Sequence, residues 1–428
     1  MSKRRQSKQL QIVFLGRSER SDGGYRPTRY IIDGHACEPT RFIGFNLAER
    51  FKPNRLLILG TPGSMWDCLL TETGQVAKLG QLDMLELVSQ VDDECVDAEM
   101  LARIQPLVAE AMGIEDTRLA LMGTGMDLAG QVDLLTTIAA HVDPGWRVNL
   151  DITHGLRHLP MIAMLSAMHL RASKPDVTIG RLSYASFRRA ADGHGEGELV
   201  DLSGAVQIAD WVAAIETFRR TGQYRELVPL LKADLGRALT DPLEKVAFRE
   251  ETMDFDGALE SLREFAGLLG TESFQGPSRL VEDMLTERLD WAMQGSLFQR
   301  QRVAAWTALG QGRYTRAILL GAEAVATRYL EETGRPVHSK HLRKDLTALI
   351  HDERRLSPKT WRHFNDLREL RNFQAHIGHA GQQLRDWMRS PSSLEGKLRQ
   401  LFKALLDSPR LTQGEAVKAE KPAARSRR

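Results

Sequence analysis

The chain has 428 residues, enough for two or three domains, because single hydrophobic cores rarely grow beyond about 250 residues. Hydrophobic residues make up 42% and charged residues 27%, and no apolar run approaches the ~20 residues of a membrane helix, so we expect a globular protein with no membrane partner. The formal net charge of +2 excludes a generally basic protein and leaves only local patches for binding nucleic acid.

The first 16 residues, MSKRRQSKQLQIVFLG, place basic residues before a short apolar run. Charged residues follow at once and no small-residue cleavage site is present, so we expect a basic leader and a strand rather than a secretory signal. The cysteines Cys37, Cys68 and Cys95 are far apart and odd in number, which predicts neither a disulfide framework nor a metal site. This cysteine usage favours the reducing cytoplasm.

Short apolar runs in the first 200 residues predict β-strands, and helical patterns separate them. The runs are apolar on both faces, which is typical of a parallel sheet covered by helices on both sides, so we expect an α/β fold. In chain order the predicted strands are 10–16, 55–60, 118–123, 147–153 and 177–187, with a helix over 127–142.

Small and polar residues follow four of the predicted strands, in the loops 16–18, 60–64, 123–125 and 153–155. In a parallel sheet the carboxyl ends of the strands meet at one edge, so these loops are expected to line one rim. Glycine, serine and threonine there suit a phosphate-bearing ligand, because small side chains let backbone N–H groups approach it. The glycine spacing matches neither the dinucleotide fingerprint nor the phosphate-binding loop, so no nucleotide cofactor is expected.

Beyond about residue 205 strand patterns disappear and helical patterns continue to Leu405, so the second half is predicted to be all-α. We expect four parts in all, the last of them a disordered basic tail rich in Ala, Lys and Arg. Their boundaries are 1–205 for the α/β domain, 206–300 for a helical connector, 301–410 for a second helical domain and 411–428 for the tail.

Polar residues are concentrated where the fourth strand ends, in the segment VNLDITHGLRHLPMIAML (148–165). His154 and His158 are four residues apart and would share a helix face, but no third ligand lies at metal-site spacing, so no metal is expected. Asp151 and Thr153 could instead cap a helix beginning near His154, with Gly155 allowing a tight turn.

The residues LDITHGLRHLP (150–160) resemble the Asp-x-Thr-His-Gly signature of CRISPR-associated proteins with an N-terminal CARF domain, a Rossmann-like sensor of cyclic oligoadenylate. ILGTPGSMWD (58–67) and FLGRSE (14–19) resemble loops of the same family, so the similarity extends over about the first 200 residues. It implies that two such domains pair across a twofold axis and hold the cyclic ligand in a shared groove.

The resemblance also implies which residues contact the ligand. Arg157 and His158 either reach phosphates or lie on a helix surface. The residues expected to face the ligand are Arg17, Ser18, Gly63, Ser64, Thr153, His154 and Gly155, with Arg157 as a further candidate.

A second motif lies in the segment LSPKTWRHFNDLRELRNFQAHIGHAG. Ser357 and Pro358 fit the N-cap and first position of a helix over about 358–377. Near its end, RNFQAH (371–376) resembles the Arg-x4-His signature of HEPN ribonuclease domains in the same family. The pattern is weak alone, but it follows the CARF signature by about 220 residues.

These residues suit RNA cleavage without a metal or other cofactor. A histidine such as His376 can accept a proton from a ribose 2′-OH or donate one to the leaving oxygen, because the reference pKa of the imidazole, near ~6.5, leaves both forms available. Arg371 can stabilise the negative charge that develops on the phosphate. The expected products are 2′,3′-cyclic phosphate and 5′-OH ends, and DNA is excluded because it lacks the nucleophile.

At ~100° per residue, Arg371 and His376 lie about 140° apart on the helix, whereas Arg368, Asn372 and His376 share a face. One helix therefore makes an incomplete site, and we expect a homodimer in which two Arg/His sets meet. Asn372 would orient His376 or bind phosphate, which adds it to the catalytic set. Arg368 would bind RNA or, as the plainer alternative, form a surface salt bridge with Asp366 or Glu369.

The sequence therefore predicts an allosteric endoribonuclease that cleaves single-stranded RNA when cyclic oligoadenylate binds its CARF dimer. The resemblance favours cyclic tetra-adenylate, with cyclic hexa-adenylate as the alternative, made by a type III CRISPR effector complex that the protein does not stably bind. Two other hypotheses remain: a regulator without enzymatic activity, and a CARF domain that also cleaves its own ligand near a base such as His154.

Overall fold

The computed structural model describes seven stretches of the chain, which divides into two compact units, Met1–Asp210 and Trp211–Arg428. The described residues are 7–17, 25–155, 158–189, 195–269, 274–293, 295–375 and 381–413.

The first unit is built on an eight-stranded, mostly parallel sheet with the strand order β3-β2-β8-β7-β6-β1-β4-β5. β1 pairs in parallel with both β4 and β6, β4 with β5, and β6 with β7, while β8 runs antiparallel to β7. The strands are β1 Gln9–Leu15, β2 Thr28–Ile32, β3 His35–Ala36, β4 Arg55–Gly60, β5 Thr117–Leu121, β6 Arg147–Asp151, β7 Thr178–Arg189 and β8 Gly195–Asp201.

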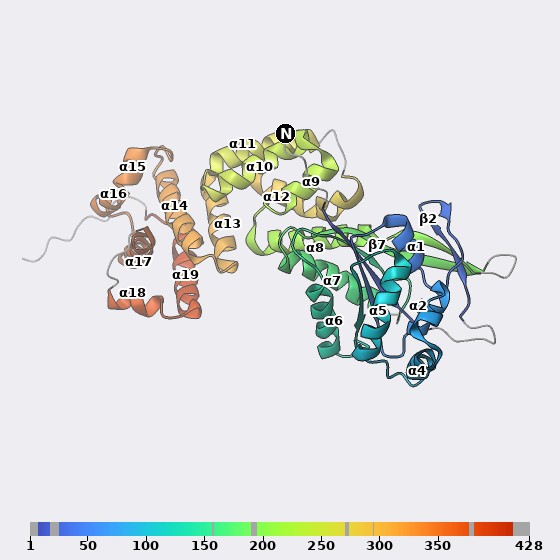
Figure 1. Cartoon of the computed structure of the whole chain (residues 1–428). Coiled ribbons are helices and arrows are strands. Elements are labelled where there is room, and N and C mark those ends of the chain that lie inside the picture. The colour runs from blue at the N-terminus through green and yellow to red at the C-terminus, as the bar shows by residue number, and fades with distance from the viewer. Residues whose placement is uncertain are drawn as a thin grey trace, which may run out of the picture. The chain divides into compact units, whose positions relative to one another are not determined.

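Helices cover both faces of this sheet (Figure 1). Alternate residues of β1 face opposite ways: Val13 and Leu15 pack with α1, α2, α4 and α5, whereas Ile12 and Phe14 pack with α6, α7 and the start of α8. The helices are α1 Gly44–Phe51, α2 Trp66–Thr73, α3 Val76–Leu79, α4 Gln81–Asp92, α5 Ala98–Met112, α6 Leu128–Ala140, α7 Leu159–Ser173 and α8 Ser203–Thr221, which continues into the second unit.

The predicted α/β class and all five predicted strands are confirmed, as β1, β4, β5, β6 and β7. The sequence analysis missed β2, β3 and β8, which extend the sheet beyond β7. β8 reads GEGELVD and offers no apolar run, and it exists because its backbone pairs with the length of β7 from Ser183 to Arg189. β8 also pairs in parallel with β2 on its other side, so it is stabilised by pairing on both sides rather than by its own composition.

The described part of the second unit contains helices and no strand, as predicted. Its apolar side chains form two separate clusters, one between Trp211 and Leu285 and one between Ala305 and Leu411. The helices are α9 Leu227–Leu235, α10 Arg237–Glu251, α11 Phe255–Leu269, a 3₁₀ helix at Gly276–Val281, α12 Glu282–Met293, α13 Leu297–Gly310, α14 Tyr314–Glu332, α15 Lys340–Lys344, α16 Leu346–Glu353, α17 Pro358–Ala375, α18 Gln382–Trp387 and α19 Pro391–Leu405.

The predicted start of the tail at residue 411 is wrong. Leu411 is buried in the second cluster, and the backbone N–H groups of Leu411 and Thr412 donate to the Glu332 carboxylate at 2.9 and 2.7 Å. Two residues that contact a distant helix produce no periodic apolar pattern, so the sequence could not predict that Leu411 and Thr412 belong to the folded unit. Residues 414–428 lie outside the described part of the chain. Every helix within the described residues is too short or too polar to be a membrane span.

The loops after β1 and β4 are bound to each other through Ser64. Its hydroxyl is buried, donates to the carbonyl oxygen of Leu15 at 2.7 Å, and accepts from the backbone N–H of Thr61 at 2.9 Å. The Met65 N–H donates to the carbonyl oxygen of Gly16 at 3.0 Å. These bonds fix the position of two of the four loops that were predicted to share one rim.

Replacing Ser64 with Ala removes the hydroxyl and leaves two buried backbone groups without their partner. We expect Ser64→Ala to lower the free energy of unfolding of the first unit by about 1–3 kcal/mol. Calorimetry of the full chain measures this as an earlier transition of that unit. Ser89→Ala is the matched control, because Ser89 is exposed on α4, and an equal loss in both variants would contradict the bracing role of Ser64.

Candidate functional site

The four polar loops lie at one edge of the sheet, as the sequence predicted. Besides the contacts of Ser64, the loops after β5 and β6 meet where the His158 imidazole Nε2 lies 2.6 Å from the carbonyl oxygen of Thr124. Gly16 and Gly155 are also close, since a Cβ atom on Gly16 would lie 2.8 Å from the Gly155 nitrogen. The four loops therefore form one continuous rim.

Asp151 and Thr153 hold this rim in shape. The Asp151 carboxylate is fully buried, accepts from the Thr153 N–H at 3.1 Å, and accepts from the Ser183 hydroxyl at 2.8 Å. The Thr153 hydroxyl oxygen accepts from the N–H of Ala185 at 2.9 Å. Both side chains thus bind the β6 loop to β7. The capping hypothesis for this pair is wrong, because α7 begins only at Leu159 and these side chains bond elsewhere.

The His154 side chain turns toward β2 and α1. Its Nε2 lies 3.3 Å from the Tyr30 hydroxyl oxygen and 3.5 Å from the Ile43 nitrogen, and its ring packs on that of Phe42. Burial lowers the pKa of His154 to about 4, so the imidazole is neutral at pH 7. His154 and His158 bond to different elements and do not share a helix face, which corrects that part of the sequence analysis.

The surface of the rim consists of backbone and small side chains. Gly155 is exposed with a φ of +113°, a conformation that favours glycine, and Gly123 and Thr124 are exposed beside it. Arg17 is exposed and pairs with Glu94 at the end of α4. Such a surface can donate backbone N–H groups to an anion from several loops at once.

The remaining residues predicted to contact a ligand have different positions. Gly63 is buried next to Glu94, and the Ser64 hydroxyl is already occupied by backbone groups. Ser18 and Arg157 lie outside the described residues. Thr124 lies at the rim in the loop 123–125, as predicted. Glu94, which the sequence analysis did not single out, also lies there next to Gly63; no local pattern marks it, because it follows the end of α4.

A second candidate site lies on α17, where the hydroxyl of Ser357 accepts from the Thr360 N–H and caps the helix as predicted. Arg371 and Asn372 are exposed near the end of α17, and an Arg371 guanidinium N–H donates to the Asn372 side-chain oxygen at 3.3 Å. Both line a hollow of about 320 Å³ between α14, α15, α16 and α17. His376 and the predicted helix end at Gly378 lie outside the described residues.

Other expectations for this helix are partly corrected. Asp366 pairs with Lys397 at 2.7 Å, so it is not the partner of Arg368, and no ion pair joins Arg368 to Glu369 within the described chain. On the neighbouring α14, Arg328 is buried and donates to the carbonyl oxygens of Leu405 and Ser408, so it stabilises the fold and is not among the residues that line this hollow.

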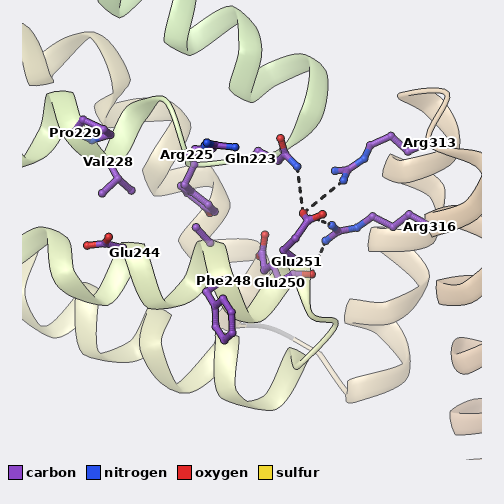
Figure 2. Close-up of a pocket in the computed structure, with 13 residues that line it drawn as sticks. Gln223, Arg225, Val228, Pro229, Glu244, Phe248, Glu250, Glu251, Arg313 and Arg316 are labelled. Carbon is purple, nitrogen blue, oxygen red and sulfur yellow. Dashed lines mark hydrogen bonds and ion pairs between the residues drawn. The ribbon is translucent and has the colours of Figure 1, made fainter.

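A larger hollow of about 430 Å³ lies in the second unit, and the charges of its arginines are neutralised by a carboxylate of the same hollow (Figure 2). Its carboxylate, Glu251, pairs with Arg313 at 3.5 Å and Arg316 at 3.0 Å, and accepts from the Gln223 amide at 3.2 Å. Burial favours a higher pKa for Glu251, but the Gln223 bond and the two arginines lower its pKa overall. These arginines also donate to the carbonyls of Thr221 and Glu250, so their charge is already used within the protein.

No cluster of three potential metal ligands occurs among the described side chains. The rim and the hollow beside α17 differ in the chemical groups that they present. The rim of the sheet offers backbone donors and a neutral histidine, and the hollow beside α17 offers arginines and an amide.

Burial raises the pKa of Asp151 to about 6. The hydrogen bonds from Ser183 and Thr153 favour the charged form and lower this pKa, but burial is the larger effect. Between the unfolded value near ~3.9 and this value the folded chain binds the extra proton, so stability falls as pH rises through that window. We expect Asp151→Asn to remove this dependence, which amounts to at most about 3 kcal/mol. Calorimetry from about pH 4 to pH 7 measures it.

Asp127→Asn is the matched control for this measurement, because the exposed Asp127 caps α6 and asparagine caps a helix equally well. The same pH dependence in the native chain and in Asp151→Asn would contradict the raised pKa of Asp151.

No protein-family model matches this chain. Part of it is similar to "CRISPR-associated protein MJ1674" of Methanocaldococcus jannaschii, at 23% identity over 216 residues. The match covers 47% of this chain and 34% of that protein, so the chain spans about a third of its relative.

Proposed function

We propose that this protein is an endoribonuclease of type III CRISPR defence that is activated by cyclic oligoadenylate. The observation that carries the proposal is the rim, where four parallel-strand loops present backbone groups and small side chains beside the Asp-x-Thr-His-Gly motif (Asp151 to Gly155). The similarity to a CRISPR-associated protein supports the same biological setting.

The ligand is proposed to be cyclic tetra-adenylate, with cyclic hexa-adenylate as the alternative. A ring of phosphodiesters carries one negative charge per nucleotide, which suits backbone N–H donors. Arg17 would also bind it if the ligand replaced Glu94 in the exposed ion pair. His154 is neutral at pH 7, so the rim carries no cationic histidine from this position. A ring with an even number of nucleotides has the twofold symmetry that a pair of rims would match.

Exposed apolar side chains beside the rim support a homodimer. Met161 and Leu165 on α7 are 73% and 53% exposed, and Leu128 on the adjacent α6 is 76% exposed. These residues lie on the first two turns of helices that begin at the rim. Pairing this apolar patch with that of a second copy would remove it from water and bring two rims together.

The helical unit is proposed to supply the ribonuclease. In a dimer, Arg371, Asn372 and His376 from each copy would meet in one cleft. His376 would move the proton between the 2′-OH and the leaving 5′-oxygen, and Arg371 would stabilise the charged phosphate. The 2′-oxygen attacks phosphorus as the 5′-oxygen bond breaks, which leaves a 2′,3′-cyclic phosphate and a 5′-OH and requires no metal.

Activation requires that the cyclic ligand bind the active arrangement more tightly than the resting one, because a ligand without differential affinity shifts no population. The proposal therefore includes a ligand-dependent rate, rather than constitutive cleavage. The CRISPR effector complex enters only as the source of the ligand, so no stable complex with it is expected.

The first test is cleavage of a labelled single-stranded RNA in EDTA, with and without each cyclic oligoadenylate. We expect ligand-dependent cleavage to 2′,3′-cyclic phosphate ends, abolished in His376→Ala and lowered about 10²- to 10³-fold in Arg371→Ala. Arg362→Ala is the matched control, because Arg362 is exposed on the same helix away from the hollow. Binding of either ring without any cleavage would overturn the ribonuclease and favour a regulator.

The same incubation tests whether the rim degrades its ligand. Linear oligoadenylate that accumulates in His376→Ala would show that the first unit cleaves the ring, and intact ring would exclude this activity.

The second test is the oligomeric state of Met161→Glu/Leu165→Glu, measured by sedimentation. We expect the native chain to be a dimer and this variant a monomer that has lost ligand-dependent cleavage, since buried like charges oppose pairing. Leu82→Glu/Leu85→Glu is the matched control, because these side chains are also more than half exposed, on α4 at the other face of the sheet. If the Met161→Glu/Leu165→Glu variant is still a dimer, the dimer interface does not include this apolar patch.

A further inference from the structure

The hollow beside α17 carries more positive charge than the proposed reaction uses. Its lining includes four cationic side chains and one carboxylate, so three positive charges remain without a negative counterpart there. The cations are Arg343, Lys344, Arg368 and Arg371, and the carboxylate is Glu323. Only Arg371 has a role in the chemistry proposed above.

Arg343 is the one cation of this group that the fold has neutralised and fixed. Its guanidinium donates to the Glu323 carboxylate at 2.6 Å, to the Thr327 hydroxyl at 2.7 Å, and to the Val337 carbonyl at 2.7 Å. The bonds to Glu323 and Thr327 hold α15 against α14, and the bond to Val337 fixes the segment that precedes α15. As a result Lys344, the next residue, is presented at the edge of the hollow.

Lys344 and Arg368 have no carboxylate partner among the described residues. Lys344 is exposed, and the Nε of the half-buried Arg368 is buried without a hydrogen-bond partner in the described structure. The adjacent carboxylate of Glu369 is exposed. The half-buried carboxylate of Asp366, two residues before Arg368, pairs with Lys397. A buried guanidinium nitrogen without a partner costs free energy unless a ligand supplies an acceptor.

Arg368 precedes Arg371 by three residues, so the two side chains lie about one turn apart along α17 and border the same hollow. An RNA strand whose reacting phosphate lies at Arg371 would therefore carry a neighbouring phosphate toward Arg368 and Lys344. Phosphate oxygens are the acceptors that an arginine fork and a lysine bind most strongly.

We propose that Arg368 and Lys344 form a phosphate-binding subsite that holds the RNA backbone beside the bond to be cleaved. The inference rests on the proposed ribonuclease and deepens it by naming side chains that bind substrate without taking part in the chemical step. Arg343 acts as a positioning residue that fixes α15. The subsite binds the phosphates of the RNA backbone and does not contact the bases, so it contributes affinity for RNA but no preference for a base.

The test measures binding of a 2′-O-methyl RNA, which cannot be cleaved, to the full chain with its cyclic activator over a range of salt concentrations. We expect Lys344→Gln/Arg368→Gln to weaken binding about 10- to 100-fold. The slope of log affinity against log salt should fall by about 1.4, because each phosphate contact to a single strand contributes about 0.7. Cleavage of saturating RNA should keep nearly its native rate constant.

Lys359→Gln/Arg362→Gln is the matched control, since it removes the same charge from exposed positions of α17 outside the hollow. Arg368→Lys in the native background should keep the native salt slope, which separates loss of charge from loss of folding. Native affinity and salt slope in Lys344→Gln/Arg368→Gln, or an equal loss in the control, would overturn the subsite. Absence of cleavage by the native chain in the EDTA assay overturns the ribonuclease instead, so the two failures are distinguishable.

Discussion

The rim depends on one constraint, which is that the central strands of the sheet are buried on both faces. β1, β4 and β6 lie between two layers of helices, so their polar groups must either be bonded internally or lie at the strand ends. Asp151, the last residue of β6, is fully buried and satisfied by Ser183 and Thr153. This bonding fixes the loop that follows and leaves the exposed backbone of Gly155 at the edge of the sheet.

The same principle separates the two hollows compared above, which both lie in the helical unit. In the larger hollow, Arg313 and Arg316 share the Glu251 carboxylate and donate to backbone carbonyls, which makes that hollow part of the structure. In the smaller hollow, Lys344 and Arg368 have no such partner within the described chain. Unpaired cations that line a cavity are available to an anion, so charge pairing rather than volume distinguishes these two hollows.

The Asp-x-Thr-His-Gly stretch shows how far sequence reasoning about a site can reach. The residues were correctly located at a strand end on the rim, because an apolar run that ends in polar residues marks such an edge. Their individual contacts were not predictable, since Thr153 bonds to Ala185 and His154 to Tyr30, and both partners belong to strands that are distant in sequence. The small residue Gly155, which has no side chain to bond, is the one left exposed.

The sequence by itself determined the five apolar strands, the capped helix that begins at Pro358 and the change from α/β to all-α structure, because all of these follow from local periodicity and capping. Tertiary structure alone decided that β8 exists, that Asp366 pairs with Lys397 rather than with Arg368, and that Lys344 and Arg368 border one hollow. Each of these depends on which distant segments become neighbours. Hydrogen bonding and charge pairing select among such neighbours only after the core has packed.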